Sequence, residues 1–206
     1  MPESLIAFIV TSIAIELTPG PNMAYLAILS LDRGRVAGLA AVAGVALGLA
    51  VLGIAAVYGL GLLIADTRWL YETLRWAGIL YLLWLAYDTW RDSRRPVKAG
   101  EEADRLAVHF RRGLVTNLLN PKAAILYVTV LPNFVDATTP TWSPSVLLTS
   151  IHVTIATAIH AAIVLAAGGL KPFVVSAKFR GRLGIAFALI LVGIAVWLAI
   201  STRRAW

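Results

Sequence analysis

The chain has 206 residues, of which 59% are hydrophobic and only 14% are charged. Soluble domains usually carry about 25% charged residues, so this composition indicates an integral membrane protein. The absence of cysteine excludes disulfides, thiolate metal ligands and cysteine nucleophiles. Only three histidines are present, so we expect neither a metal site nor a cofactor. The net charge of +7 comes largely from loops beside apolar stretches, which favours membrane orientation over nucleic-acid binding.

Six apolar stretches approach or exceed the roughly 20 residues that a membrane-spanning helix needs. They run at about 4–30, 36–65, 69–90, 113–135, 145–170 and 181–200. The first follows Met1-Pro2-Glu3 without a basic segment, so we expect a permanent span and no signal peptide. The long linker, 91–112, is polar and of mixed charge, which predicts a mobile loop.

Positive charge predicts the orientation in the membrane. The linkers after the first, third and fifth stretches hold thirteen Lys and Arg residues, against four on the other side. Because such residues concentrate on the cytoplasmic side, these linkers are expected there and both termini outside. Arg203 and Arg204 favour the alternative of a cytoplasmic C-terminus, which would require five spans.

Proline interrupts the first and fourth stretches, at Thr18-Pro19-Gly20-Pro21-Asn22 and Asn120-Pro121-Lys122. A bilayer tolerates a broken helix only where it is buried in protein or lines a cavity. The ends of the half-helices would present partial positive charge to a carboxylate and partial negative charge to an ammonium group. An amino acid offers both, although a simple packing kink is the alternative. The candidate translocation residues at the breaks are Thr18, Pro19, Gly20, Pro21, Asn22, Asn117, Asn120, Pro121 and Lys122.

The two halves of the chain resemble each other weakly. Residues 21–26 can be aligned with 121–126, and 84–91 with 197–204, although chance similarity between Ala/Leu-rich segments is the alternative. Each half holds three spans, and since three is odd the second half would run opposite to the first. The sequence therefore predicts an all-α integral membrane fold in one transporter domain, 1–206. Its six transmembrane helices would form two inverted three-helix repeats, about 1–90 and 113–206, with helices 1 and 4 broken at Pro.

Two ionisable residues are expected near the middle of the bilayer. At the helical rise, Glu16 lies roughly 18 Å into the first span and Lys122 roughly 14 Å into the fourth. Ionisable groups at this depth are expensive and usually functional. Glu16 could pair with Lys122, carry a proton or bind a substrate ammonium group, and a purely structural ion pair is the alternative. Asp88 and Arg91 share a helical face, which predicts a surface ion pair.

Gly44 and Gly48 form a G-x-x-x-G pair in the second span, which predicts close helix packing within the monomer or in a homodimer. His152 and His160 are eight residues apart, roughly 80° around a helix. We expect hydrogen-bonded core or interface histidines, and a proton relay is the alternative. With no cysteine and few carboxylates nearby, the pattern indicates neither zinc nor an intramembrane protease.

Several segments resemble the LysE/RhtB family of amino-acid exporters: 17–22, the Gly-rich second span, 78–85 and 117–123. The resemblance covers essentially the whole chain. It implies a secondary exporter of amino acids or their derivatives in the bacterial inner membrane, driven by the proton gradient. The positions that match the family's motifs are Pro19, Gly20, Pro21, Asn22, Asn120, Pro121 and Lys122. Leu49 departs from the pattern, because many members have a polar or acidic residue there.

The sequence thus predicts an alternating-access exporter and not an enzyme. A neutral or weakly cationic amino acid would enter a midplane site from the cytoplasm, and protonation of Glu16 would reset the carrier. The expected partners are the amino acid, the proton and the lipid bilayer. The alternatives are an exporter of another small solute or a metal cation, and a non-transporting membrane scaffold. A membrane enzyme would need a nucleophile, metal or acid–base site that the sequence does not offer.

Overall fold

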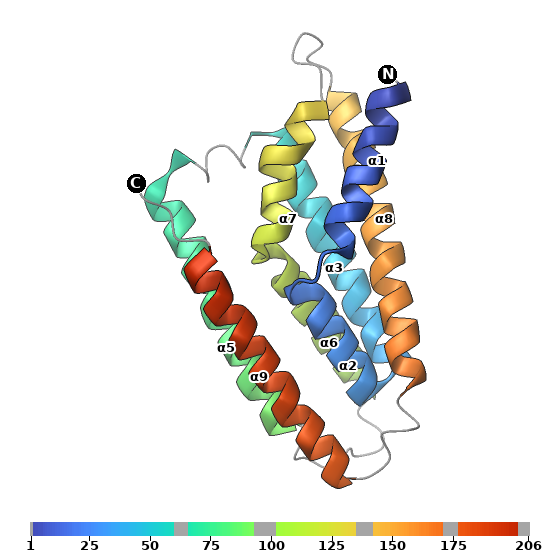
Figure 1. Ribbon diagram of the computed structural model, residues 1–206, viewed down its shortest axis with the longest axis vertical. Coiled ribbons are helices and arrows are strands. Elements are labelled where there is room, and N and C mark those ends of the chain that lie inside the picture. Colours follow the sequence, from blue (N-terminus) through green and yellow to red (C-terminus); the bar gives the residue numbers. More distant parts are fainter. Residues whose placement is uncertain (1, 60–65, 93–101, 135–141, 171–176, 202–206) are drawn as a thin grey trace.

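The computed structural model describes residues 2–59, 66–92, 102–134, 142–170 and 177–201. In these ranges the secondary structure is helical throughout (Figure 1). The longer helices are α1 (Pro2–Leu17), α2 (Pro21–Arg33), α3 (Arg35–Val57), α5 (Arg68–Asp92), α6 (Glu102–Leu118), α8 (Trp142–Gly169) and α9 (Ala177–Ser201). Three short ones connect α6 to the segment before α8, namely α7 (Pro121–Ile125), the π-helix η1 (Leu126–Val130) and the 3₁₀-helix η2 (Leu131–Phe134).

Some of the described helices have the length and hydropathy of membrane spans. Helix α3 and the segment Pro144–Gly169 of α8 are each long and apolar enough to cross a bilayer. Helices α1 and α2 meet at 56° and are long and apolar enough only as a bent pair, which is either a broken span or a re-entrant loop. Helix α9 has a shorter apolar core, Ile185–Ile200. An all-helical membrane fold is therefore confirmed, and the arrangement as six spans in inverted repeats stays a prediction.

The helices form a bundle with an inclined pair beside it (Figure 1). In the bundle, α3 packs against α6 and α8, and α8 also contacts both α1 and α2. Helices α5 and α9 lie side by side along their length and reach the bundle through contacts with α6 and α2. At the second break Asn120 is buried, whereas Leu17, Thr18 and Pro19 at the first break are exposed.

Glycines allow α3 and α6 to approach until their backbones touch. A Cβ atom on Gly44 would collide with the carbonyl oxygen of Phe110, and one on Gly113 would collide with that of Ala41. A Cβ on Gly48 would lie 2.9 Å from the Cβ of Asn117. The close contacts of Gly44 and Gly48 are thus made within the chain, while a homodimer stays a prediction.

Two sequence predictions about the third linker and its neighbours are wrong. Residues 102–112 are not loop but the first part of α6, since Leu106, His109, Phe110 and Gly113 follow helical spacing. Asp88 pairs with Arg112 of α6 rather than with its neighbour Arg91, at 2.6 Å between Oδ2 and Nη2. The rest of the predicted mobile loop, 93–101, lies outside the described residues, as do 60–65 at the end of the predicted second span.

We predict that Gly44→Ala destabilises the protein by about 1–3 kcal/mol, because the new methyl group meets backbone that cannot rotate away. Gly193→Ala is the matched control, since nothing lies within 4 Å of the position of its added Cβ. Thermal unfolding in detergent should show a lower midpoint for Gly44→Ala and no loss for Gly193→Ala. Equal midpoints in the two variants would contradict the close α3–α6 contact.

Candidate functional site

The first break separates the C-terminus of α1 from the N-terminus of α2. Helix α1 ends at Leu17, and Gly20 precedes α2 in an extended conformation with φ −154°. Pro21 occupies the start of α2, where its missing N–H leaves no unpaired donor. Thr18 turns back and donates its hydroxyl to the Ala14 carbonyl at 3.0 Å. The carbonyl end of one half-helix and the amide end of the next therefore lie close together.

The second break has a different construction. Asn120 caps α7, and its Oδ1 accepts a hydrogen bond from the backbone N–H of Lys122 at 3.1 Å. Pro121 stands at the first helical position, as Pro21 does in α2. The chain then continues into the π-helix η1 and the 3₁₀-helix η2 instead of a regular α-helix. Such π turns occur often at functional sites.

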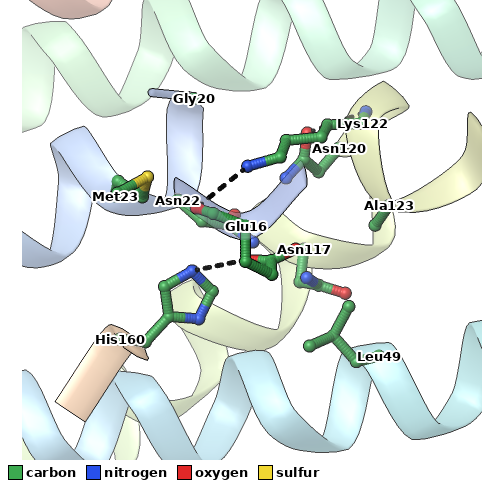
Figure 2. A pocket seen from close by; sticks show the side chains of 10 residues that line it. All are labelled: Glu16, Gly20, Asn22, Met23, Leu49, Asn117, Asn120, Lys122, Ala123 and His160. Carbon is green, nitrogen blue, oxygen red and sulfur yellow. Dashed lines mark hydrogen bonds and ion pairs between the residues drawn. The ribbon is translucent and has the colours of Figure 1, made fainter. Parts of the chain in front are cut away.

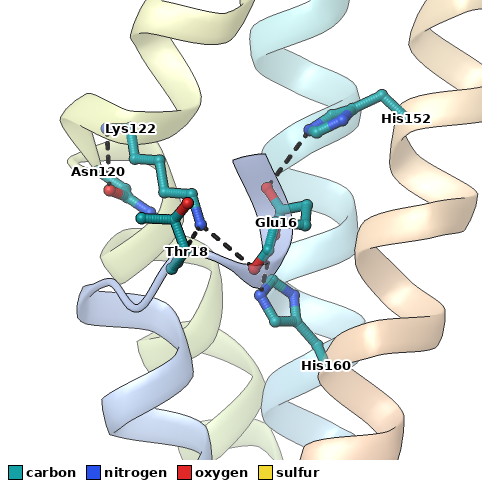
Figure 3. A network of polar contacts seen from close by, with 6 residues as sticks. All are labelled: Glu16, Thr18, Asn120, Lys122, His152 and His160. Atoms are coloured by element: carbon teal, nitrogen blue, oxygen red, sulfur yellow. Dashed lines mark hydrogen bonds and ion pairs between the residues drawn. The ribbon is translucent and has the colours of Figure 1, made fainter. Parts of the chain in front are cut away.

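Lys122 connects the two breaks (Figure 3). Its ammonium group donates to the carbonyl oxygen of Thr18 at 2.7 Å and lies 3.4 Å from that of Glu16. Its Cδ would lie 3.4 Å from a Cβ on Gly20. A cation here satisfies unpaired carbonyls and complements the negative end of the α1 dipole. Pairing with Lys122 was one of the roles that the sequence left open for Glu16, and the hydrogen bond of Lys122 to this residue is made with its backbone carbonyl.

The Glu16 carboxylate instead faces two histidines of α8. His152 Nε2 lies 3.7 Å from Oε1, and His160 Nε2 lies 3.4 Å from Oε2. All three side chains are buried, and Figure 3 shows the imidazoles on opposite sides of the carboxylate. The histidines are buried as predicted, but in the described part of the chain the expected hydrogen bonds are not seen for either nitrogen of His152 or for Nδ1 of His160, and the shared partner Glu16 was not predicted. No group among the described residues has the make-up of a metal site.

A pocket lies between the two breaks (Figure 2). The empty space around its side chains, open solvent included, is about 230 Å³. Six of the predicted residues line it, namely Glu16, Gly20, Asn22, Asn117, Asn120 and Lys122. Four further residues complete it, namely Met23, Leu49, Ala123 and His160. Thr18, Pro19 and Pro21 do not line the pocket and belong to the break beside it.

Two lining asparagines carry polar atoms without a hydrogen-bond partner among the described residues. They are Oδ1 of Asn22 and both Oδ1 and Nδ2 of Asn117. The side chains are closed off from solvent, since Asn22 is 4% exposed and Asn117 0%. A buried polar group without a partner costs about 1–3 kcal/mol. The pocket thus presents a free donor and free acceptors that a polar solute would satisfy.

Broken helices around a buried polar pocket are typical of a membrane carrier. The family model described as "LysE type translocator" matches residues 13–202. The chain belongs to this family and is a multi-pass protein of the bacterial inner membrane. Proteins of this kind are transporters and not enzymes.

The relatives of the chain include uncharacterized membrane proteins and proteins named for efflux. It is 28% identical to an uncharacterized membrane protein of Vibrio cholerae over 196 residues, which are 94% of this chain and 95% of the relative. It is 36% identical over 137 residues to the leucine efflux protein of Salmonella typhimurium, covering 65% of this chain and 64% of the relative. An Escherichia coli membrane protein, YahN, is 34% identical over 61% of this chain and 57% of its own. No solved structure matches the chain significantly.

We predict that Lys122→Met lowers stability by about 1–3 kcal/mol, because the carbonyls of α1 lose a charged donor. Arg91→Met, at an exposed position of α5, removes the same charge as a control. Thermal unfolding in detergent should show a drop for Lys122→Met that Lys122→Arg partly restores. An unchanged midpoint in Lys122→Met would show that the contact with Thr18 does not stabilise the break.

Proposed function

We propose that this protein is a secondary-active exporter of amino acids, coupled to protons and working by alternating access. The observation that carries the proposal is the unpartnered pair Asn22 and Asn117 in a pocket that also holds Lys122 and Glu16. These side chains offer a cation, an anion and neutral donors and acceptors around one small space. An amino acid carries matching groups on a single carbon atom.

The charges of the pocket favour one orientation of the substrate. Its carboxylate would lie toward the ammonium group of Lys122 and the N-terminus of α2, where unpaired N–H groups favour an anion. Its ammonium group would lie toward Glu16 and the Oδ1 of Asn22.

The apolar part of the lining favours a neutral side chain on the substrate. Met23, Leu49 and Ala123 would surround it, and Leu49 offers no charge to a lysine-like cation. The relative named as a leucine efflux protein supports the same choice. We therefore propose neutral apolar amino acids, with leucine as the first candidate.

For the transport cycle we propose six spans in two inverted repeats, with the breaks at the interface of the repeats. Glu16 would take up a proton in one state and release it in the other, and the two histidines beside it would adjust that exchange. The substrate and the proton would then compete for the Glu16 charge. Such competition couples the two flows without requiring both solutes to bind together.

The proposal is tested by loading cells with dipeptides that are hydrolysed to single amino acids inside. Cells that lack the gene should accumulate leucine or a similar amino acid, and cells that express it should release this amino acid. Metal salts and other small metabolites are offered in parallel. Efflux that does not differ between the two strains for any amino acid would overturn the proposal.

We predict that Asn117→Leu, which keeps the approximate shape of the side chain, abolishes export and leaves stability equal or higher. Removing both unpartnered atoms of Asn117 relieves a cost of about 1–3 kcal/mol while taking hydrogen bonds from the substrate. Thr73→Val, on the exposed surface of α5, serves as the control. Export and thermal unfolding are measured together. A destabilised but active variant would assign Asn117 a purely structural role.

We predict that Glu16→Gln, which keeps size and hydrogen bonding, lowers proton-driven export at least about tenfold with expression intact. The neutral amide can bind solutes but cannot take up and release a proton near neutral pH. The measurement is efflux against an imposed pH gradient in vesicles. Proton-coupled export at the wild-type rate in this variant would remove Glu16 from the coupling mechanism.

A further inference from the structure

A second set of buried polar side chains lies beside Glu16 and outside the pocket lining. It consists of Ser12 on α1, Thr149 and His152 on α8, and Tyr127 on η1. All four are buried, and none of them lines the pocket. Contact with the pocket is therefore not the reason that these four polar side chains are buried. The set, which we call the outer polar cluster, is the subject of the inference.

The geometry connects the outer polar cluster to Glu16. His152 Nε2 lies 3.7 Å from the Glu16 carboxylate, and the His152 and Tyr127 rings meet edge to face with centroids 5.7 Å apart. A Cβ on Gly53 would lie 2.9 Å from Thr149 Oγ1 and 3.0 Å from Tyr127 Cε1, so both side chains converge on that glycine. Ser12 stands one turn before Glu16 on α1, and Thr149 one turn before His152 on α8.

The cluster has polar atoms without a hydrogen-bond partner among the described residues. They are Ser12 Oγ, Tyr127 OH, Thr149 Oγ1 and both imidazole nitrogens of His152. Each such group costs about 1–3 kcal/mol in a folded protein. By contrast, Ser150 and Thr154 on the exposed face of α8 each donate to a carbonyl of their own helix. Polar side chains with only a packing role would also donate to a carbonyl of their own helix, or apolar residues would stand in their place.

We propose that the outer polar cluster is the proton pathway to Glu16, separate from the route of the amino acid. The inference rests on the proposed function. A proton that enters at one hydroxyl displaces that group's own proton onward, so every hydroxyl and the imidazole is regenerated. Water bridges any pair too far apart for a direct hydrogen bond. The Glu16 carboxylate takes up the proton and becomes a neutral carboxylic acid.

The direction of the pathway follows from the helices that carry it. Ser12 and Thr149 lie on the N-terminal side of Glu16 and His152, so the cluster extends toward the start of α1 and of α8. The distribution of positive charge predicts that this side is extracytoplasmic. His160 and Lys122 line the pocket on the other side of the carboxylate. Protons would thus reach Glu16 from outside, while the amino acid reaches it from the cytoplasm.

The charged and titratable groups around Glu16 are few. From α8 they are His152 and His160, from the second break Lys122, and from η1 Tyr127. The residues of α3 that face this region, Leu49 and Gly53, carry no ionisable group. Tyr127 and His152 are therefore the ionisable members of the outer polar cluster.

The experiment separates proton coupling from substrate binding in proteoliposomes. Exchange of radiolabelled leucine against internal leucine needs no net proton movement, whereas uptake driven by an imposed pH gradient does. Tyr127→Phe and Thr149→Val remove one hydroxyl each and keep the shape of the side chain. Tyr87→Phe and Thr154→Val make the same changes at exposed positions and serve as controls.

We expect Tyr127→Phe and Thr149→Val to lower gradient-driven uptake about tenfold or more while exchange stays within about twofold of the wild type. The controls should retain both activities. Unchanged gradient-driven uptake in both variants would overturn the pathway, and so would an equal loss of uptake and exchange. A wild type that exchanges leucine without responding to the gradient would overturn it as well. A wild type that exchanges no amino acid at all would instead refute the proposed function.

Discussion

The hydrogen bonds between the Lys122 ammonium group and the carbonyl end of α1 join the two helix breaks. A helix that stops inside a membrane leaves carbonyl groups that neither lipid nor water can satisfy. Lys122 donates to the carbonyl of Thr18 and approaches that of Glu16. The second break thus supplies a charged hydrogen-bond donor to the carbonyl groups at the first break. Lys122 and Glu16 also line the pocket together, so this contact lies at its edge.

The Glu16 carboxylate has different polar neighbours on its two sides. Lys122 donates to carbonyl groups, while the Glu16 carboxylate lies 3.7 Å from His152 and 3.4 Å from His160. On one side of it lie the unpartnered asparagines of the pocket, and on the other lies the outer polar cluster. We propose that this buried acid, with polar side chains on both sides, exchanges a substrate against a proton.

The sequence was sufficient to predict features that are local. Proline and ionisable residues stand out within apolar stretches, so the breaks, Glu16 and Lys122 were all identified. What depends on the rotation of helices could not be predicted. Whether α8 turns His152 toward Glu16 or toward lipid is decided by its packing on α1 and α3, because α8 is apolar nearly all round. The sequence predicts a loop at the start of α6, because charged residues are frequent there and loops have the same composition.

The most direct test asks whether an amino acid occupies the space between the breaks. The natural chain has no cysteine, so Met23→Cys would place a single thiol in the lining of the pocket. Alkylation of this thiol in purified protein should slow saturably as leucine is added, and Asn117→Leu should remove that protection. A cysteine at Gly193, distant from the pocket lining, should react at a constant rate. Alkylation at position 23 that no amino acid slows, in a protein that still exports, would contradict the account.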